Sequence, residues 1–354
     1  MSNGIVRRPA VPPPVRIRRD VAKLSSSDPI LVFYEKAIAV MQQGNRLDLS
    51  SSWRYQGAVH DYPSDPNTGR IDERPFPART NDPNQATGDK FPSDANTFWA
   101  TCEHGSWFFL SWHRMYLHFF EKIIMKIVAN LPDGPKDWAL PYWNVSTSDD
   151  SAKLPEPFRK PDNITNHLFV RQRPDRINKG QDFLNVDRFG NIDPAKPDTN
   201  LRCLQAKSFR GVRPAFGGPA RSFHFPDNSG TLEMVPHNVV HNNFGAGSFM
   251  FDPEKAALDP IFWLHHSNID RLWEVWVQRQ KQLSRLTRNP KDADADPDSK
   301  TWLDGNGSST DGKFRFRDES GTDVTITSRE VLDTRQPPLS YEYEDISDPF
   351  TGAP

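Results

Sequence analysis

The chain lacks the features that mark several common protein classes. Its 354 residues include only two cysteines, Cys102 and Cys203, so it is no disulfide scaffold. No apolar run approaches the ~20 residues that a transmembrane helix needs. The formal charge is −2 and the sequence carries no basic stripe, which gives no support for binding to nucleic acid or to an anionic membrane. We find no internal repeat at a fixed period.

The N-terminal residues also lack the pattern of a signal peptide. Arg7 and Arg8 are not followed by the apolar stretch that both Sec-type and twin-arginine signals require. A cytoplasmic location is therefore the default expectation, and secretion of a processed form stays open.

The chain is rich in proline and poor in apolar residues. With 32 prolines, 36% hydrophobic residues and low mean hydropathy, it is expected to form a modest core wrapped in long ordered loops. Apolar periodicity and capping residues predict helices over residues 28–43, 107–129, 236–245 and 259–283. Residues 53–96 and 131–230 are expected to be mainly loop. The segments FRFRD and DVTITSREVL predict a small hairpin near the C-terminus.

Histidines gather in three short segments. His104 and His113 flank an almost entirely aromatic stretch in HGSWFFLSWHR. His237 and His241 in HNVVH stand at i and i+4, on one face of a helix. The third segment is DPIFWLHHSNID, and one more histidine lies upstream. Imidazoles in dry surroundings are neutral at pH 7 and suit a borderline-soft transition metal. The six candidate ligands for two copper ions are His60, His104, His113, His237, His241 and His266.

Other readings of these histidines are weaker. A lone histidine in an aromatic segment is more often a satisfied core residue, but three such segments in one chain favour a metal. The HNVVH spacing matches that of zinc proteases, yet Asn238 stands where their catalytic Glu would be. No Glu-x-x-His pair supports a carboxylate-bridged di-iron site, and no Cys-plus-Met set supports a blue-copper centre. All-imidazole ligation with an open position favours copper that handles dioxygen.

These segments resemble the two copper-binding regions of the type 3 copper family, which comprises tyrosinases, catechol oxidases and molluscan-type haemocyanins. Residues 104–121 follow the first signature: a His, a Phe, then Trp-His-Arg, and a Glu eight residues after the second His. Residues 259–270 follow the second, with Asp-Pro-x-Phe, the ligand His and an Asp four residues on. The resemblance implies one copper on His60, His104 and His113. It implies a second copper on His237, His241 and His266, with His265 beside the site rather than on the metal.

The resemblance also implies supporting roles. Cys102 precedes His104 by two residues, an arrangement that in fungal members forms a thioether to the ligand ring, so we expect that bond here. Glu233 and Asn238 are expected to hold a water that takes the proton of a phenol, whose pKa is near 10. The loop expected to gate the substrate comprises Phe249, Met250, Phe251, Asp252 and Pro253.

Further residues are expected to support the ligands and close the domain. Asp270 and Arg271 are expected to give structural support beside the last ligand, with Asp270 accepting from a ligand ring or anchoring an adjacent Arg. Arg18 or Arg19 is expected to stack on the terminal tyrosine of the Tyr341-x-Tyr343 pair and so tie the chain ends together.

The fold expected is mainly α, a central four-helix bundle holding a dinuclear copper centre, with long loops and a few short strands. Residues 1–17 are expected to form an extended arm, 18–345 the copper domain and 346–354 a short tail. No C-terminal segment is expected to plug the site.

The expected function is that of a tyrosinase-type polyphenol oxidase, which uses dioxygen bound as peroxide between two copper ions. It would hydroxylate monophenols and oxidise o-diphenols to o-quinones, as in melanin formation. A catechol oxidase or o-aminophenol oxidase, or a haemocyanin-like oxygen carrier, remain alternatives. Small phenols are the expected partners, a copper chaperone stays open, and the oligomeric state is not predicted.

Overall fold

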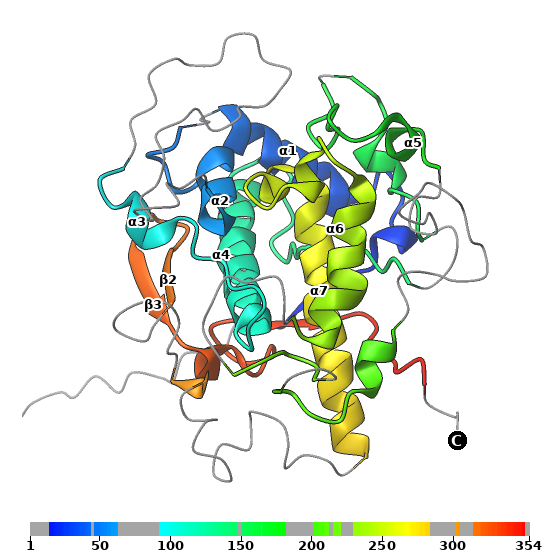
Figure 1. The fold of residues 1–354 in the computed structure, drawn as a ribbon. Coiled ribbons are helices and arrows are strands. Elements are labelled where there is room, and N and C mark those ends of the chain that lie inside the picture. The colour runs from blue at the N-terminus through cyan, green and yellow to red at the C-terminus, as the bar shows by residue number, and fades with distance from the viewer. Residues whose placement is uncertain are drawn as a thin grey trace, which may run out of the picture.

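The computed structural model describes residues 14–43, 46–62, 92–146, 151–163, 165–181, 201–211, 215–220, 229–283, 302–304 and 314–350. Its helices are α1 Pro29–Gln43, α2 Trp53–His60, α3 Ala95–Phe98, α4 Phe109–Ala129, α5 Asp175–Asn178, α6 Val239–Phe244 and α7 Pro260–Gln282. Its strands are β1 Arg16–Arg18, β2 Phe314–Arg317, β3 Asp323–Ile326 and β4 Tyr341–Tyr343. The predicted mainly α fold with a few short strands is confirmed (Figure 1).

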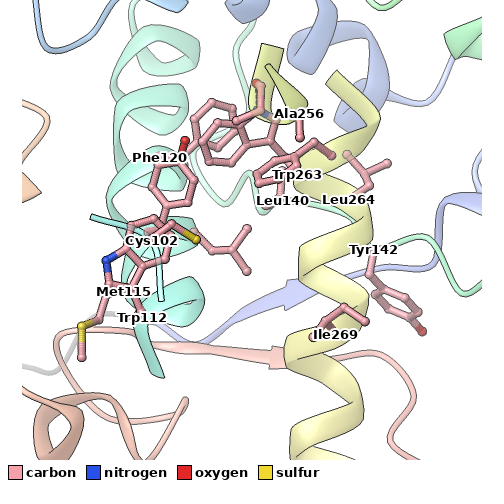
Figure 2. Close-up of a cluster of buried hydrophobic side chains, with 14 of the residues drawn as sticks. Cys102, Trp112, Met115, Phe120, Leu140, Tyr142, Ala256, Trp263, Leu264 and Ile269 are labelled. Carbon is pink, nitrogen blue, oxygen red and sulfur yellow. Dashed lines mark hydrogen bonds between the residues drawn. The ribbon is translucent and has the colours of Figure 1, made fainter. Parts of the chain in front are cut away.

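Helices α4 and α7 run side by side through the middle of the molecule, and α1 and α2 lie across one end of them (Figure 1). Both long helices are buried around most of their circumference, which accounts for their many aromatic residues. Phe120 of α4 stacks on Trp263 of α7 with ring centroids 3.4 Å apart (Figure 2). Helix α7 begins where Asp259 accepts a hydrogen bond from the Ile261 backbone N–H, with Pro260 in the first turn.

Helix α2 lies in a segment that was predicted to be loop, and that prediction was wrong. Ser52 caps the helix by accepting from the Tyr55 N–H at 3.1 Å. All eight residues of the helix are buried, so its sequence, WRYQGAVH, shows no one-sided apolar stripe for periodicity to detect. His60 therefore stands at the last position of a helix, not in a loop.

The third predicted helix is real, but its first part is irregular. A π-helical turn, Glu233–Asn238, precedes α6, and Val235 inside it has an extended backbone with φ −144° and ψ 118°. The residue before a proline is driven from the helical region by the ring, and Pro236 follows. Helix α6 ends at Gly245, whose φ of +80° suits glycine.

The hairpin near the C-terminus is confirmed, but it is shorter than expected. Strands β2 and β3 pair antiparallel, with Phe314 opposite Ile326. The following residues, Ser328–Val331, form a 3-10 helix capped by Thr327 and Glu330. That capping box ends the strand because Thr327 and Glu330 satisfy the backbone of a helical turn.

The two ends of the described chain meet in the core. Strand β1 pairs in parallel with β4, which places Arg18 opposite Tyr343. The arginine involved is Arg18, whose guanidinium carbon lies 5.6 Å from the centroid of the terminal Tyr343 ring and closer, at 3.6 Å, to that of Tyr341. Among the described residues, no helix has the length and apolar character that crossing a bilayer requires.

Candidate metal centre

Three imidazoles and one thiol meet on the α2–α4 side of the core. We call this set group A: His60, Cys102, His104 and His113. His60 ends α2, His113 lies in the first turns of α4, and His104 precedes that helix. One potential ligand atom from each member lies within 4.8 Å of those of the others. The structure thus joins the His104–His113 segment to a histidine that sequence order alone left uncertain.

Four imidazoles meet on the opposite side, on α7 and the kinked helix. We call this set group B: His237, His241, His265 and His266. The π-helical turn and α6 supply the first two histidines, whose ring centroids are 4.6 Å apart. Their ligand atoms also lie within 4.8 Å of one another. Group B therefore contains one histidine more than predicted.

The two groups face each other closely enough to share one bound species. The rings of His113 and His266 stack with centroids 4.3 Å apart and 7° between their planes. His104 and His237 approach to 5.8 Å. His266 contacts rings of group A as well as group B, whereas among the described residues His265 contacts imidazoles of group B. This difference favours His266 over its neighbour as the ligand in the shared space.

Burial keeps the group B imidazoles neutral. It is the main cause that lowers the pKa of His241 to about 4, and it holds the pKa values of His237, His265 and His266 well below their usual range. Nearby imidazoles add to the effect, because two like charges at this distance would repel. A neutral ring nitrogen with a free lone pair is the form that binds a metal.

Hydrogen bonds through Nδ1 orient several of the imidazole rings. Nδ1 of His113 donates to the Phe109 carbonyl at 2.8 Å, and Nδ1 of His237 donates to Asn238 Oδ1 at 2.8 Å. Since Nδ1 then carries the proton, Nε2 is left with its lone pair. Nε2 of His237 and both ring nitrogens of His266 are buried without a hydrogen-bond partner among the described residues. Buried polar atoms of this kind need a partner, and a metal ion between the two groups would supply it for one nitrogen of each ring.

Cys102 lies against the ligand that the thioether prediction names. Its Sγ is 3.3 Å from Nδ1 and 3.8 Å from Nε2 of His104, the two nitrogens that flank one ring carbon. It also lies 3.4 Å from Nε2 of His113. Cys102 and Cys203 are both buried and are not joined by a disulfide, so no such bond competes for the sulfur. The contact suits a bond to His104, which stays a prediction.

A cavity of about 300 Å³ opens over both groups. Its histidine walls come from His60 and His104 on one side and from His237 and His241 on the other. The other lining residues are Glu233, Asn238, Asn242, Met250, Phe251, Pro253 and Ala256. Of the predicted gate residues, Met250, Phe251 and Pro253 line the cavity, whereas Phe249 and Asp252 do not. Asn242 and Ala256 were not predicted, although Asn242 directly follows a ligand candidate.

Glu233 joins the two halves of the site. Its carboxylate accepts from the Gly105 backbone N–H at 2.9 Å through Oε1 and at 3.1 Å through Oε2. Gly105 directly follows His104 and has a φ of +62°, which only glycine adopts without strain. Glu233 therefore belongs to the cavity wall, where a carboxylate can meet a bound molecule.

Asp270 anchors arginines, which was one of its two expected roles, and does not support a ligand ring. It accepts from Arg114, Tyr341, Tyr343 and Arg18, and within the described part of the chain no hydrogen bond joins it to a ligand ring or to Arg271. The pairing of the two chain ends places arginine guanidinium groups and tyrosine hydroxyls around this buried carboxylate. These groups satisfy its hydrogen bonds and balance its charge.

Arg271 is used elsewhere. It donates to Asn268 Oδ1 at 2.9 Å and to the Asp345 carbonyl at 3.1 Å. Both residues therefore hold the chain ends and α7, not the imidazoles.

Comparison with known proteins agrees with this geometry. The sequence profile of the common central domain of tyrosinase matches residues 50–279, which include every histidine of both groups. This chain belongs to the tyrosinase family. The profile of the polyphenol oxidase middle domain also matches, over residues 299–353. The predicted membership of the tyrosinase family is thereby confirmed.

Relatives of this family member include bacterial and plant proteins. A tyrosinase of Hahella sp. (strain CCB-MM4) is 33% identical over 341 residues, covering 93% of this chain and 63% of the relative. A chloroplastic polyphenol oxidase of Malus domestica is 31% identical over 264 residues, covering 70% of this chain and 39% of the relative. The chain thus spans less than two thirds of the length of these relatives.

Solved structures of the family share the fold. Latent apple tyrosinase superposes with a TM-score of 0.65 at 26% identity, covering 97% of this chain and 65% of that one. Polyphenol oxidase of Grenache (Vitis vinifera) gives 0.63 at 25% identity, covering 98% and 94%. Groups A and B fit two copper ions, as the sequence predicted.

Proposed function

We propose that the protein is a tyrosinase-type polyphenol oxidase, which hydroxylates monophenols and oxidises o-diphenols to o-quinones. The observation that carries this proposal is the carboxylate of Glu233 in the wall of a cavity over two facing sets of imidazoles. A relative of 33% identity is called a tyrosinase, and others are called polyphenol oxidases.

The ligand assignment belongs to the same proposal. One copper would be held by His60, His104 and His113, and the other by His237, His241 and His266. When bound, the copper pair supplies the redox chemistry with dioxygen. The chain holds the ligand nitrogens neutral, aims them by hydrogen bonds through Nδ1, and surrounds them with buried aromatic rings that exclude water.

Glu233 handles the proton of a monophenol. A phenol has a pKa near 10 and is protonated at neutral pH, so it must lose its proton before it can act as an anionic donor. Glu233 is oriented by the Gly105 N–H and lines the cavity with Asn238. In this proposal the two residues hold the water that takes the proton. Asn238 also accepts from Nδ1 of His237, so it orients a ligand at the same time.

The cavity suits a small aromatic substrate. Its volume of about 300 Å³ lies at the lower end of the usual range for small-molecule sites. Met250 and Phe251 give it an apolar edge on which a ring can pack. We therefore propose simple phenols as the substrate class.

A Glu233→Gln variant tests the proposal. Hydroxylation of tyramine should fall roughly 100-fold, as for loss of a general base, while oxidation of the matching diphenol falls less than about tenfold. Glu103→Gln is the matched control, since Glu103 is buried one residue before His104, pairs with Ser106 and is not part of the cavity lining.

Two other outcomes would contradict the proposal. Equal losses of both activities in Glu233→Gln would remove the proton-handling role and favour a catechol oxidase. Absence of any catechol turnover by the copper-loaded native protein, measured with an oxygen electrode, would favour an oxygen carrier.

A further inference from the structure

Residues 249–253, which we call the mouth segment, contribute a partly exposed stretch to the cavity wall. Met250, Phe251 and Pro253 line the cavity. Phe249 and Met250 are buried, whereas Phe251 is 41% exposed. The segment is therefore anchored in the core at its start and presents one aromatic ring at the edge of the cavity.

The backbone of the mouth segment holds one imidazole from each group. Nδ1 of His241 donates to the Met250 carbonyl at 2.5 Å. Nδ1 of His60, from the other half of the site, donates to the Pro253 carbonyl at 3.0 Å. In both rings the proton then lies on Nδ1, which leaves the Nε2 lone pair for a metal. A displacement of this segment would move or release a ligand of both groups at once.

A set of hydrogen bonds and one ion pair around Asp252, which we call the brace, holds the backbone of the mouth segment. The Asp252 N–H donates to the Phe249 carbonyl at 3.0 Å, and the Asp252 carboxylate accepts from the Glu254 N–H at 3.1 Å. The same carboxylate pairs with the Lys255 ammonium, and the Lys255 N–H donates to the Asp252 carbonyl at 2.9 Å. The ion pair is partly exposed, so it holds the segment only weakly, as surface pairs do.

We propose that the mouth segment is a shared positioning strap, which couples occupation of the cavity mouth to retention of both copper ions. An aromatic ring that packs on Phe251 favours the braced form of the segment. In that form the Met250 and Pro253 carbonyls hold His241 and His60 in place, so the ring slows loss of the metals. Because the coupling is reciprocal, the braced form also binds the ring better. Two parts of this inference rest on the proposed function: the choice of an aromatic ring as the occupant, and the assignment of His60 and His241 as copper ligands.

Copper extraction tests this strap without any turnover. The copper-loaded protein is mixed with excess EDTA, and copper loss is followed with and without benzoate, a ring that carries no phenol hydroxyl. In Lys255→Met the brace loses its ion pair, and extraction of both copper ions should quicken roughly fivefold. Asp175→Asn is the matched control, since Asp175 forms a similar exposed pair with Lys179 away from the site, and its rate should equal the native rate.

The effect of the ring gives the second readout. Benzoate should slow extraction from the native protein several-fold and should have little effect in Phe251→Ala. Native extraction rates in Lys255→Met, or equal protection by benzoate in Phe251→Ala, would overturn the proposal. Faster loss of only one copper in Lys255→Met would also overturn it, because the strap holds a ligand of each group.

Thermal unfolding of the copper-free variants tests whether faster copper extraction arises from general destabilisation of the protein. The Lys255–Asp252 pair is partly exposed and contributes little to global stability, so the copper-free Lys255→Met protein should unfold close to the native temperature. A lowered unfolding temperature that alone accounts for the faster extraction would count against the strap. Because extraction needs no substrate chemistry, its failure leaves the Glu233 comparison untouched, and failure of that comparison leaves the strap untouched.

Discussion

Groups A and B provide similar nitrogen donors but are assembled in different ways. Group A is drawn from the end of α2, from the segment before α4 and from α4 itself, and it includes the Cys102 thiol. Group B lies on the kinked helix and on α7 and contains imidazoles alone. Group A thus depends on distant segments meeting, whereas much of group B follows from spacing along helices. The comparison shows that two sets of similar ligands can depend to different degrees on long-range contacts in the fold.

The largest expected effect comes from removing one ligand while sparing a neighbouring histidine. His113→Asn should reduce the copper content from two ions per chain to one and lower oxidase activity by more than ~100-fold, since even residues that support ligands are worth 10–100-fold. His118 lies on the same helix, is buried, and has a pKa that burial lowers to about 3. His118→Asn should keep both copper ions.

Measuring the copper content of the His113→Asn and His118→Asn proteins tests the assignment of group A. Two ions retained in His113→Asn would break the assignment of group A. Loss of both ions would show that group B cannot hold a copper alone, and the two groups would then be one cooperative site.

Cys102 is the chemical difference between the groups, and its replacement should have an intermediate effect. If the thioether forms, the thiol hydrogen and one ring hydrogen are lost, with their two electrons passing to dioxygen. The native protein should then be lighter by two hydrogens than its sequence mass. Cys102→Ser should abolish that difference and weaken copper binding by roughly tenfold, because the His104 ring is no longer tethered.

Cys203→Ser is the control for this pair, since Cys203 is also buried and free but lies outside both groups. Intact-mass measurement and copper titration give the readouts. A native mass equal to the sequence mass after copper loading in air would contradict the thioether, and the two groups would then differ only by a packed thiol.

The last expected effect concerns folding stability and not copper content: it is the pH dependence of the copper-free protein. Burial lowers the pKa of His241 to about 4, whereas an imidazole in the unfolded chain titrates near 6.5. Below about pH 6.5 the unfolded chain therefore binds more protons than the folded one. The stabilisation is full above that pH and is lost as the pH falls toward 4, by roughly 3 kcal/mol for His241 alone.

Urea unfolding near neutral pH and at about pH 5 measures this loss. His241→Gln should flatten the dependence, whereas His167→Gln should not, since His167 lies only partly buried beside Gln42. An unchanged slope in His241→Gln would show that the acid sensitivity arises outside group B.

Much of the fold could be predicted from local patterns. Apolar periodicity located α1, α4 and α7, because each is long enough to show its period. It missed α2, whose residues are buried on every side and so carry no stripe. It also missed the π-helical turn at Glu233, which depends on the extended backbone of Val235 before Pro236.

The candidate site divides in the same way. Most of the proposed ligands could be predicted from the sequence. The evidence was the spacing of His237 and His241 and the two signatures around His113 and His266. The sequence did not predict the position of His60 in the structure, because helix α2, which ends at His60, was not recognised. Asp270 looked like a support for a ligand ring, but the joined chain ends surround it with Arg18, Arg114 and two tyrosines.

The sequence by itself determined the kind of chemistry: six imidazoles in apolar segments, a thiol two residues before one of them, and a carboxylate four residues before another. Only the tertiary structure decided which rings face each other, that Glu233 reaches across to Gly105, and that one segment holds His60 and His241 together. The physical reason is distance along the chain. Donor types and helical spacing are local properties, whereas hydrogen bonds between residues such as His60 and Pro253 exist only after the core has packed.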